Sequence, residues 1–415
     1  MHRTIPIFDW FRGRGPERWN RNLIVCTLGS FTTIVAMTLL LPFLPVYVQE
    51  LGVSDHAAIA EWSGLAYGAT FFTAGLTAPL WGRLADRFGR KLMLIRASLG
   101  MAIAMSLIGM AHNVVELVLL RLLAGLLGGY ASGCMALIAA QTPKERAGWA
   151  LGVVATGNMA GNLAGPLIGG TLPPIIGIRA TFLLAGAVIF VTFLATTFLI
   201  REERRPVSAA RGTKGRYWAQ IPEKGPVAIM LATGFLLMFA NMSIEPIITV
   251  YVAQLVPQKH VIFVAGLVMA AAAFGAVVSS SRLGHLADLI GYRPVISACL
   301  GIAAMLLIPQ AFVTAGWQLI LLRFLMGLAL GGLIPCIAAV IRHSVPQEML
   351  AGTLGYSISS QYAGQVLGPI GGGVVGGHIG MSSVFLITAG LMAVGAGANW
   401  LTARTPRPCS CPPVP

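Results

Sequence analysis

Charged side chains are scarce in this sequence. Asp, Glu, Lys and Arg make up 10% of its 415 residues, whereas soluble domains carry about 25%. So few charges cannot keep a protein surface hydrated, which argues against an ordinary water-soluble domain. Hydrophobic residues make up 56% of the chain, a balance that suits a protein whose surface faces lipid.

Motifs of several common activities are also missing. The sequence has no Gly-rich loop ending in Gly-Lys-Ser/Thr and no His-Glu-x-x-His pattern, which disfavours an ATP-driven pump and a membrane enzyme. The six cysteines lack zinc-like or redox spacing. Four lie in apolar segments and are expected to act as small hydrophobes, whereas Cys409 and Cys411 lie in a Pro-rich tail. We expect no metal and no cofactor.

Long apolar segments run through the chain, and a spanning helix needs about twenty such residues. The sequence predicts an all-α membrane protein with twelve transmembrane helices in two six-helix bundles. The first transmembrane helix is expected to be retained in the mature protein and not cleaved as a signal peptide. The predicted spans of the first half are 22–48, 61–81, 92–111, 114–140, 149–173 and 179–200, and those of the second half are 226–253, 261–281, 294–313, 317–341, 352–376 and 381–403.

The net charge of +14 lies in short loops between these spans, so it indicates topology and no nucleic-acid partner. Lys and Arg gather on alternate loops, and the opposite side has only Arg179 and Lys259. This asymmetry predicts that both termini are cytoplasmic. The predicted parts are a cytoplasmic N-terminal segment (1–21), a first bundle (22–200), a cytoplasmic linker (201–225), a second bundle (226–403) and a cytoplasmic tail (404–415).

The two halves repeat each other in one register. The paired segments are 82–91 with 284–293, 119–125 with 321–327, 161–166 with 364–369, and 42–48 with 246–252. We infer a duplicated six-helix unit. Transporters built from such repeats commonly bind substrate at the interface between them.

Three motifs stand out in the first half. In segment 82–91, Gly82 and Gly89 permit tight turns, and Asp86, Arg87, Arg90 and Lys91 form either a charge network or a solvated topology signal. Arg121 lies deep in an apolar span, where a charge is costly; it either faces a cavity or fastens helices through backbone carbonyls. One helix face carries a glycine stripe of Gly157, Gly161, Gly165 and Gly169, and Pro166 can kink that helix.

With these motifs the chain resembles the major facilitator superfamily over nearly its whole length, and in particular the drug:proton antiporter branch. The resemblance implies that the 82–91 loop is a latch made in one conformation and broken in another. It implies a role in proton coupling for Arg121. It also implies that the glycine stripe is the motif that separates proton-driven exporters from uptake symporters, although the same stripe serves generic helix packing.

Glu245 is a more individual candidate, because Leu41 fills its position in the first repeat. A buried carboxylate exchanges protons more readily near neutral pH and attracts cations; the alternative is a carboxylate that reaches water at the helix end. Other candidates for lining a cavity are the polar residues Asn158, Asn162, Asn241, Gln361 and Gln365, and the aromatic residues Tyr67, Phe71, Tyr130, Phe235 and Phe239. Each polar residue is more often a helix–helix hydrogen bond than a ligand contact, and lipid or packing contacts explain the aromatic residues equally well.

The resulting hypothesis is a proton-coupled exporter of drugs or other amphipathic small molecules in a bacterial inner membrane. It works by alternating access, as a functional monomer, with drug-like molecules, protons and the lipid bilayer as its partners. Glu245 would carry the proton, and Arg121 would influence when the carboxylate releases it. The alternatives are an uptake symporter for a small organic solute and a membrane sensor that transports nothing.

Overall fold

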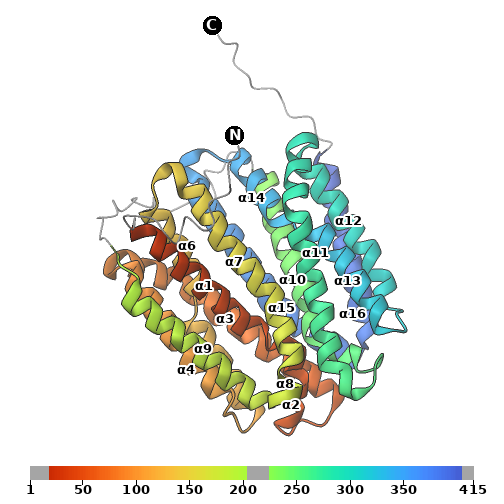
Figure 1. Ribbon diagram of the computed structural model, residues 1–415. Helices are drawn as coiled ribbons and strands as arrows, with labels where there is room; N and C mark the ends of the chain where they lie inside the picture. The colour runs from red at the N-terminus through yellow and green to blue at the C-terminus, as the bar shows by residue number, and fades with distance from the viewer. Residues whose placement is uncertain (1–17, 203–223, 404–415) are drawn as a thin grey trace, which may run out of the picture.

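The computed structural model describes residues 18–202 and 224–403. Most of the predicted N-terminal segment, most of the predicted linker, and the tail with Cys409 and Cys411 lie outside the described residues. Throughout the described ranges the regular elements are helices (Figure 1). The first half contains α1 (Arg18–Thr38), η2 (Leu41–Phe43), α2 (Leu44–Glu50), α3 (His56–Phe88), α4 (Arg90–Ile108), α5 (Val114–Leu127), α6 (Tyr130–Gln141), α7 (Lys144–Thr171), α8 (Pro173–Ile176) and α9 (Ile178–Leu199). The second half contains α10 (Lys224–Val252), η4 (Gln258–His260), α11 (Val261–Ile290), α12 (Tyr292–Gln310), α13 (Gly316–Leu330), α14 (Leu333–Ser344), α15 (Gln347–His378) and α16 (Met381–Ala403).

These helices account for the twelve predicted spans. Within the described ranges, nine helical segments are long and apolar enough to cross a membrane by length and composition. The other three spans are α3, α7 and α15, with 33, 28 and 32 residues. They are long enough, but many glycines and charged residues near one end lower their hydrophobicity. The same three helices pack where the two halves meet, as described below.

The internal repeat predicted from the sequence is visible in matching contacts. The Tyr47 hydroxyl donates to the Ile108 carbonyl at 2.6 Å, and the Tyr251 hydroxyl donates to the Gln310 carbonyl at 2.9 Å. These two pairs occupy equivalent places in the two halves. Other repeated contacts are Gly125 against the Thr70 carbonyl and Gly327 against the Ala272 carbonyl. The six-helix duplication is therefore present in the packing as well as in the sequence.

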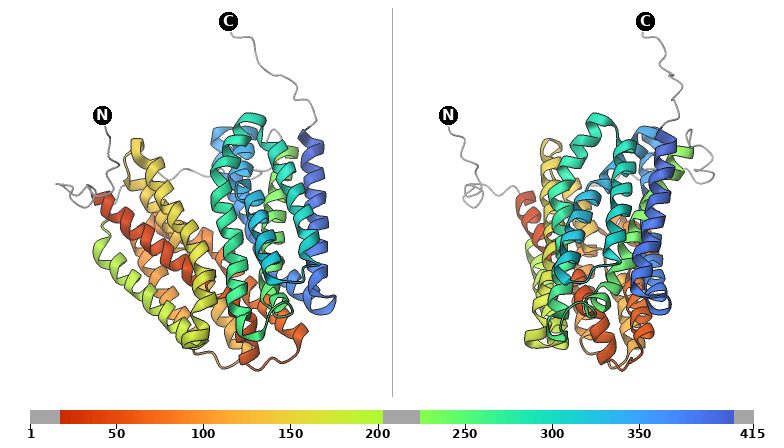
Figure 2. Two further views of the ribbon diagram at one scale, coloured as in Figure 1. Left: turned by 45° about the vertical axis from the view of Figure 1, so that its right-hand side comes forward. Right: turned by 90° about the vertical axis from the view of Figure 1, so that its right-hand side faces the viewer.

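The two halves lie side by side and diverge toward one end (Figure 2). We call the end that carries α2, α8 and η4 the closed end, and the opposite end, with the turns at Gly89 and Gly291, the splayed end. The halves meet through α3 against α15 and through α7 against α11. At the closed end, the Thr249 hydroxyl of α10 donates to the Pro42 carbonyl of η2 at 3.0 Å.

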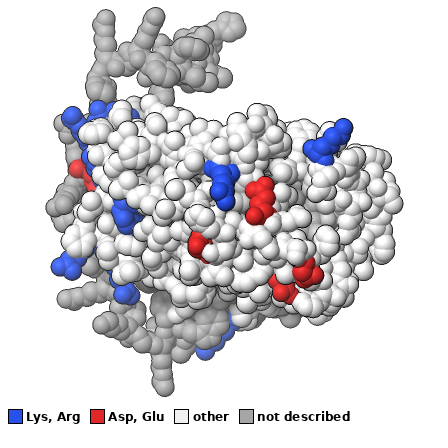
Figure 3. Space-filling view, turned by 90° about the horizontal axis from the view of Figure 1, so that it is seen from below, with Lys and Arg blue, Asp and Glu red and all other residues white. Residues whose placement is uncertain are grey.

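Charge is unevenly distributed between the two ends. Viewed from below, the closed end is a mostly uncharged face with scattered acidic and basic side chains (Figure 3). The described Lys and Arg residues at this end are Arg179 and Lys259. Those at the splayed end include Arg21, Arg83, Arg87, Arg90, Lys91, Arg146, Arg201, Lys224, Arg282, Arg293 and Arg342.

Candidate functional site

Four polar side chains from four helices meet at the boundary between the halves. Tyr67 of α3 and Arg121 of α5 belong to the first half, and Glu245 of α10 and Arg323 of α13 belong to the second. Arg121 is 0% exposed, Arg323 3% and Tyr67 4%. Charges buried at this depth in a membrane helix usually mark a transport pathway or a proton relay. We call these four residues the interface cluster.

Glu245 is half-buried and lies where α10 meets the first half. The Tyr67 hydroxyl lies beside its carboxyl group, in position to donate a hydrogen bond, and Arg323 supplies a nearby positive charge. Its Oε2 atom is buried and accepts no hydrogen bond from the described residues. An acid with one unused acceptor and a cation nearby can take up and release a proton without leaving its site.

Arg121 fastens helices through backbone carbonyls, one of the two roles that the sequence left open. Its Nε donates to the Ala66 carbonyl at 3.3 Å, while the Thr70 hydroxyl donates to the Arg121 carbonyl at 3.1 Å, so the residue helps to join α3 to α5. Its Nη1 and Nη2 atoms are buried and find no acceptor within the described part of the chain. The guanidinium Cζ lies over the Tyr67 ring, 5.9 Å from its centroid, within the range of a cation–π contact.

The structure changes which arginine stands next to the acid. We expected Arg121 to act on Glu245. Arg323 fills the position equivalent to Arg121 in the second repeat. Instead, Arg323 is the charged neighbour of Glu245, and Arg121 is separated from it by Tyr67. The physical reason is that Glu245 and Arg323 belong to one bundle, whereas Arg121 approaches from the other.

Tyr67 is the member of the cluster that sequence analysis undervalued. It was one of five aromatic candidates for drug contact, with packing an equal alternative. The available signal was its place between Gly64 and Gly68 on one helix, which indicates close approach to a neighbouring helix. Tyr130, from the same set, lies inside the first half, with its hydroxyl 2.7 Å from that of Thr196.

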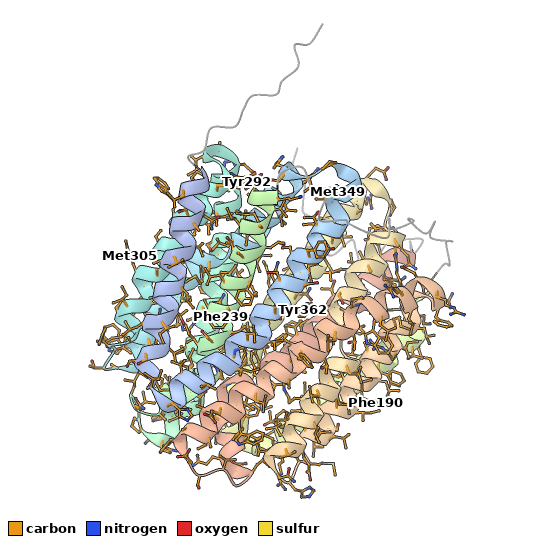
Figure 4. All side chains as sticks on the ribbon, turned by 180° about the vertical axis from the view of Figure 1, so that it is seen from behind. Phe190, Phe239, Tyr292, Met305, Met349 and Tyr362 are labelled. Atoms are coloured by element: carbon orange, nitrogen blue, oxygen red, sulfur yellow. The ribbon has the colours of Figure 1, made fainter. Side chains whose placement is uncertain are left out.

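The predicted polar candidates make other contacts in the structure, within one helix or between α15 and α10. Asn162 Nδ2 donates to the Asn158 carbonyl at 3.1 Å, and Gln361 Nε2 donates to the Ser357 hydroxyl at 3.3 Å. Gln365 Nε2 lies 3.4 Å from the Met238 sulfur of α10, and Asn241 is half-buried. Figure 4 labels two aromatic residues of the same region, Phe239 on α10 and Tyr362 on α15. The described contacts join none of the five polar residues to Glu245.

The 82–91 segment differs from its prediction in the place of its turn. Gly82 lies inside α3 and makes no turn, because the helix continues to Phe88 and the chain turns only at Gly89, where φ is +100°. Asp86 is exposed and, within the described residues, forms no ion pair with Arg87 or Arg90.

The start of α4 is held instead by an acid from another segment. Glu202 accepts from the backbone amides of Arg90 and Lys91 at 2.9 and 2.8 Å. These amides are among the donors that a helix leaves unsatisfied at its N-terminus. The acid therefore attaches the residues that follow α9 to the first turn of α4.

The glycine stripe packs α7 against α1 of the same half. Added Cβ atoms at Gly157 and Gly161 would lie 3.0 Å from the Thr27 and Phe31 carbonyls, and those at Gly165 and Gly169 would overlap Thr38 and Leu39. Another face of α7 meets the second half, since an added Cβ at Gly266 would lie 2.5 Å from the Pro166 carbonyl. Close packing is thus a definite role of the stripe.

Two repeated six-helix halves with ionisable side chains buried between them define a secondary transporter. The comparison with known proteins agrees with this class. The chain belongs to the Major Facilitator Superfamily, whose model matches residues 26–260 and 231–412.

The curated relatives cover almost the whole chain. It is 40% identical over 394 residues to multidrug resistance protein MdtG of Salmonella typhimurium, covering 94% of this chain and 98% of the relative. It is 41% identical over 387 residues to MdtG of Salmonella arizonae, covering 93% and 96%.

Solved structures share the fold at lower identity. A bacterial homologue of the human lysosomal transporter Spinster, in an inward-facing and occupied conformation, has a TM-score of 0.76 at 18% identity, covering 95% of this chain and 98% of that one. The nucleoside transporter NupG has a TM-score of 0.70 at 16% identity, covering 92% and 99%.

Proposed function

We propose that this chain exports drug-like amphipathic small molecules across a bacterial inner membrane in exchange for protons, working as a monomer. The observation that carries the proposal is the Glu245 carboxyl between the two halves, with its Oε2 atom buried and Arg323 as its charged neighbour. The name of the relatives, multidrug resistance protein, supports a drug-like substrate.

The orientation follows from the charge asymmetry. Lys and Arg are retained on the cytoplasmic side of membrane proteins, so the splayed end, where most of them lie, is assigned to the cytoplasm. In that orientation the closed end faces outward, and the conformation described here takes up substrate from inside the cell. Both termini are then cytoplasmic.

The exchange cycle uses the acid twice. When the halves rock to open the closed end, Glu245 takes a proton from external water. After the halves return, the carboxyl releases this proton toward the cytoplasm, where Arg323 stabilises the ionised form. A drug then binds from the cytoplasmic side and drives the halves outward again. One half of the cycle carries a proton inward and the other half carries a drug outward, so the proton gradient drives export.

The direct test is transport of a lipophilic cationic dye in proteoliposomes under a pH gradient, at one protein per vesicle. We expect dye extrusion that stops when the gradient is collapsed. Glu245→Gln should abolish it, because an amide carries no exchangeable acidic proton, whereas Glu50→Gln at the exposed end of α2 should not.

Three outcomes of this test contradict parts of the proposal. Full extrusion by Glu245→Gln would reject this carrier. Gradient-driven dye uptake would indicate the symporter. Extrusion that needs several proteins in each vesicle would reject the monomer.

A further inference from the structure

Tyr67 is the residue through which the first half meets the buried acid of the second. Its hydroxyl lies beside the Glu245 carboxyl. Its ring lies under the Arg121 guanidinium. The phenol therefore stands between a cation of its own half and an anion of the other, at a contact that any rocking of the halves must alter.

Two glycines place Tyr67 at this boundary. Gly64 lies against the Pro369 carbonyl of α15, and an added Cβ at Gly68 would lie 2.9 Å from the Val366 carbonyl. Without side chains at these two positions, α3 approaches α15 to backbone contact on either side of Tyr67 in the sequence. The hydroxyl is consequently held at the surface between the halves.

The strength of this link depends on the proton carried by Glu245. An ionised carboxylate accepts a charge-assisted hydrogen bond from the phenol, which is about twice as strong as a neutral one. Once protonated, the group loses its charge and most of its attraction to Tyr67 and Arg323. The hydrogen bond between the halves is therefore strongest when the proton has left.

Other titrating groups do not compete at this site. Helices α1, α7, α11, α15 and α16 carry their charged residues and histidines only near their ends, if they have any. Tyr251 of α10 donates to the Gln310 carbonyl, and Tyr362 of α15 packs against Gly75. The strength of the contact between Tyr67 and Glu245 therefore depends on groups of the interface cluster alone.

We propose that Tyr67 is a positioning residue that holds the empty, deprotonated transporter in the present conformation until substrate binds. An exchanger that returns empty after releasing its proton lets protons flow inward without export. A hydrogen bond between the halves that is strong only with ionised Glu245 opposes this return. The inference deepens the function proposed above and rests on it.

Tyr67→Phe tests the inference, because it removes the hydroxyl and keeps the ring under Arg121. The matched control is Tyr362→Phe, which removes the hydroxyl of a tyrosine on α15 whose side chain packs beside Gly75 of α3. Each protein is reconstituted under a pH gradient. Proton flux without dye and the number of dye molecules extruded per proton are measured, and dye binding in detergent confirms folding.

We expect Tyr67→Phe to raise the dye-free proton flux by about tenfold, the factor for losing a hydrogen bond to a charged group. The dye-to-proton ratio should fall while dye affinity stays unchanged. Tyr362→Phe should behave as wild type. A dye-free flux in Tyr67→Phe equal to that of wild type overturns the inference and leaves the proposed function standing.

A double variant separates this role from general loosening of the fold. Tyr67→Phe with Glu245→Gln should leak no more than Glu245→Gln alone, because the amide leaves no ionised group to hold. Additive leaks would overturn the inference. Normal exchange by Glu245→Gln alone would overturn the proposed carrier and, with it, this inference.

Discussion

Glu61 and His378 form an ion pair that joins the two halves at the closed end. His378 Nδ1, at the end of α15, lies 3.0 Å from Glu61 Oε1 of α3. The same nitrogen lies 3.3 Å from the Val374 carbonyl, so it acts as a donor toward both oxygens. Opening the closed end requires this pair to break. Asp55 and His56, at the start of α3, are the nearest other titrating groups along the helix.

Breaking this pair should favour opening of the closed end. We expect His378→Ala to raise the labelling of an Ala57→Cys reporter by a membrane-impermeant thiol reagent, because Ala57 lies under Gly377 in the closed contact. An exposed ion pair contributes at most about 1 kcal/mol, so the increase should not exceed about fivefold. Equal labelling of the two proteins would show that the pair does not hold this end.

Close packing of α7 on α1 should make Gly169 intolerant of a methyl group. A Cβ there would overlap the Leu39 carbonyl, so Gly169→Ala should destabilise the protein by about 1–3 kcal/mol. Gly152, on the same helix, has nothing within 4 Å of its added Cβ. Gly152→Ala should therefore be neutral or stabilising, by up to about 1 kcal/mol. Thermal unfolding in detergent compares the two, and equal unfolding temperatures would contradict the packing argument.

Loss of the Glu202 carboxylate should loosen the first turn of α4. Glu202→Ala leaves the Arg90 and Lys91 amides without their acceptor, at a cost of about 1 kcal/mol. Hydrogen exchange should accelerate in a peptide covering residues 89–96. A peptide at the equivalent turn, residues 291–298, serves as the internal control, and Glu202→Gln should have a smaller effect because it keeps one acceptor. Unchanged exchange at 89–96 would argue against this cap.

Removing Arg323 should disturb proton exchange more than removing Arg121, although both changes delete a buried positive charge. In Arg323→Gln the ionised Glu245 loses its charged neighbour and releases its proton less readily. Dye exchange should then fall by about tenfold near pH 7 and recover at higher pH on the cytoplasmic side. Arg121→Gln should show little of this alkaline recovery. Matching pH profiles would mean that the two arginines act alike on the acid.

The duplicated spans were predictable because their signals are local. Apolar runs of about twenty residues and motifs repeated at a constant offset need no knowledge of packing. The end of α3 was harder to predict, because a helix can continue beyond the bilayer into a charged segment. Gly82 was therefore taken for a turn, and only Gly89 has the positive φ that stops the helix.

Contacts between the halves were not predictable in the same way. Tyr67 and Glu245 come from different copies of the repeat and are not equivalent positions, so the internal offset cannot pair them. Glu245 was singled out because a lone acid in an apolar span needs an explanation. Its neighbours depend on how two bundles lie against each other, which no pattern within one helix records. The same limit made Arg121, not Arg323, seem to be its partner.

The low hydrophobicity of α7 and α15 has a consequence for how the protein is made. Each of these glycine-rich spans gains less from lipid than its neighbours do, so it enters the bilayer with a weaker preference of its own. Each also packs along a helix that is synthesised earlier, α7 along α1 and α15 along α10. When α7 and α15 are synthesised, the helices against which they pack are therefore already in the membrane. An altered helix order, as in a circular permutant, would remove these earlier partners during biogenesis even if the finished fold were equally stable.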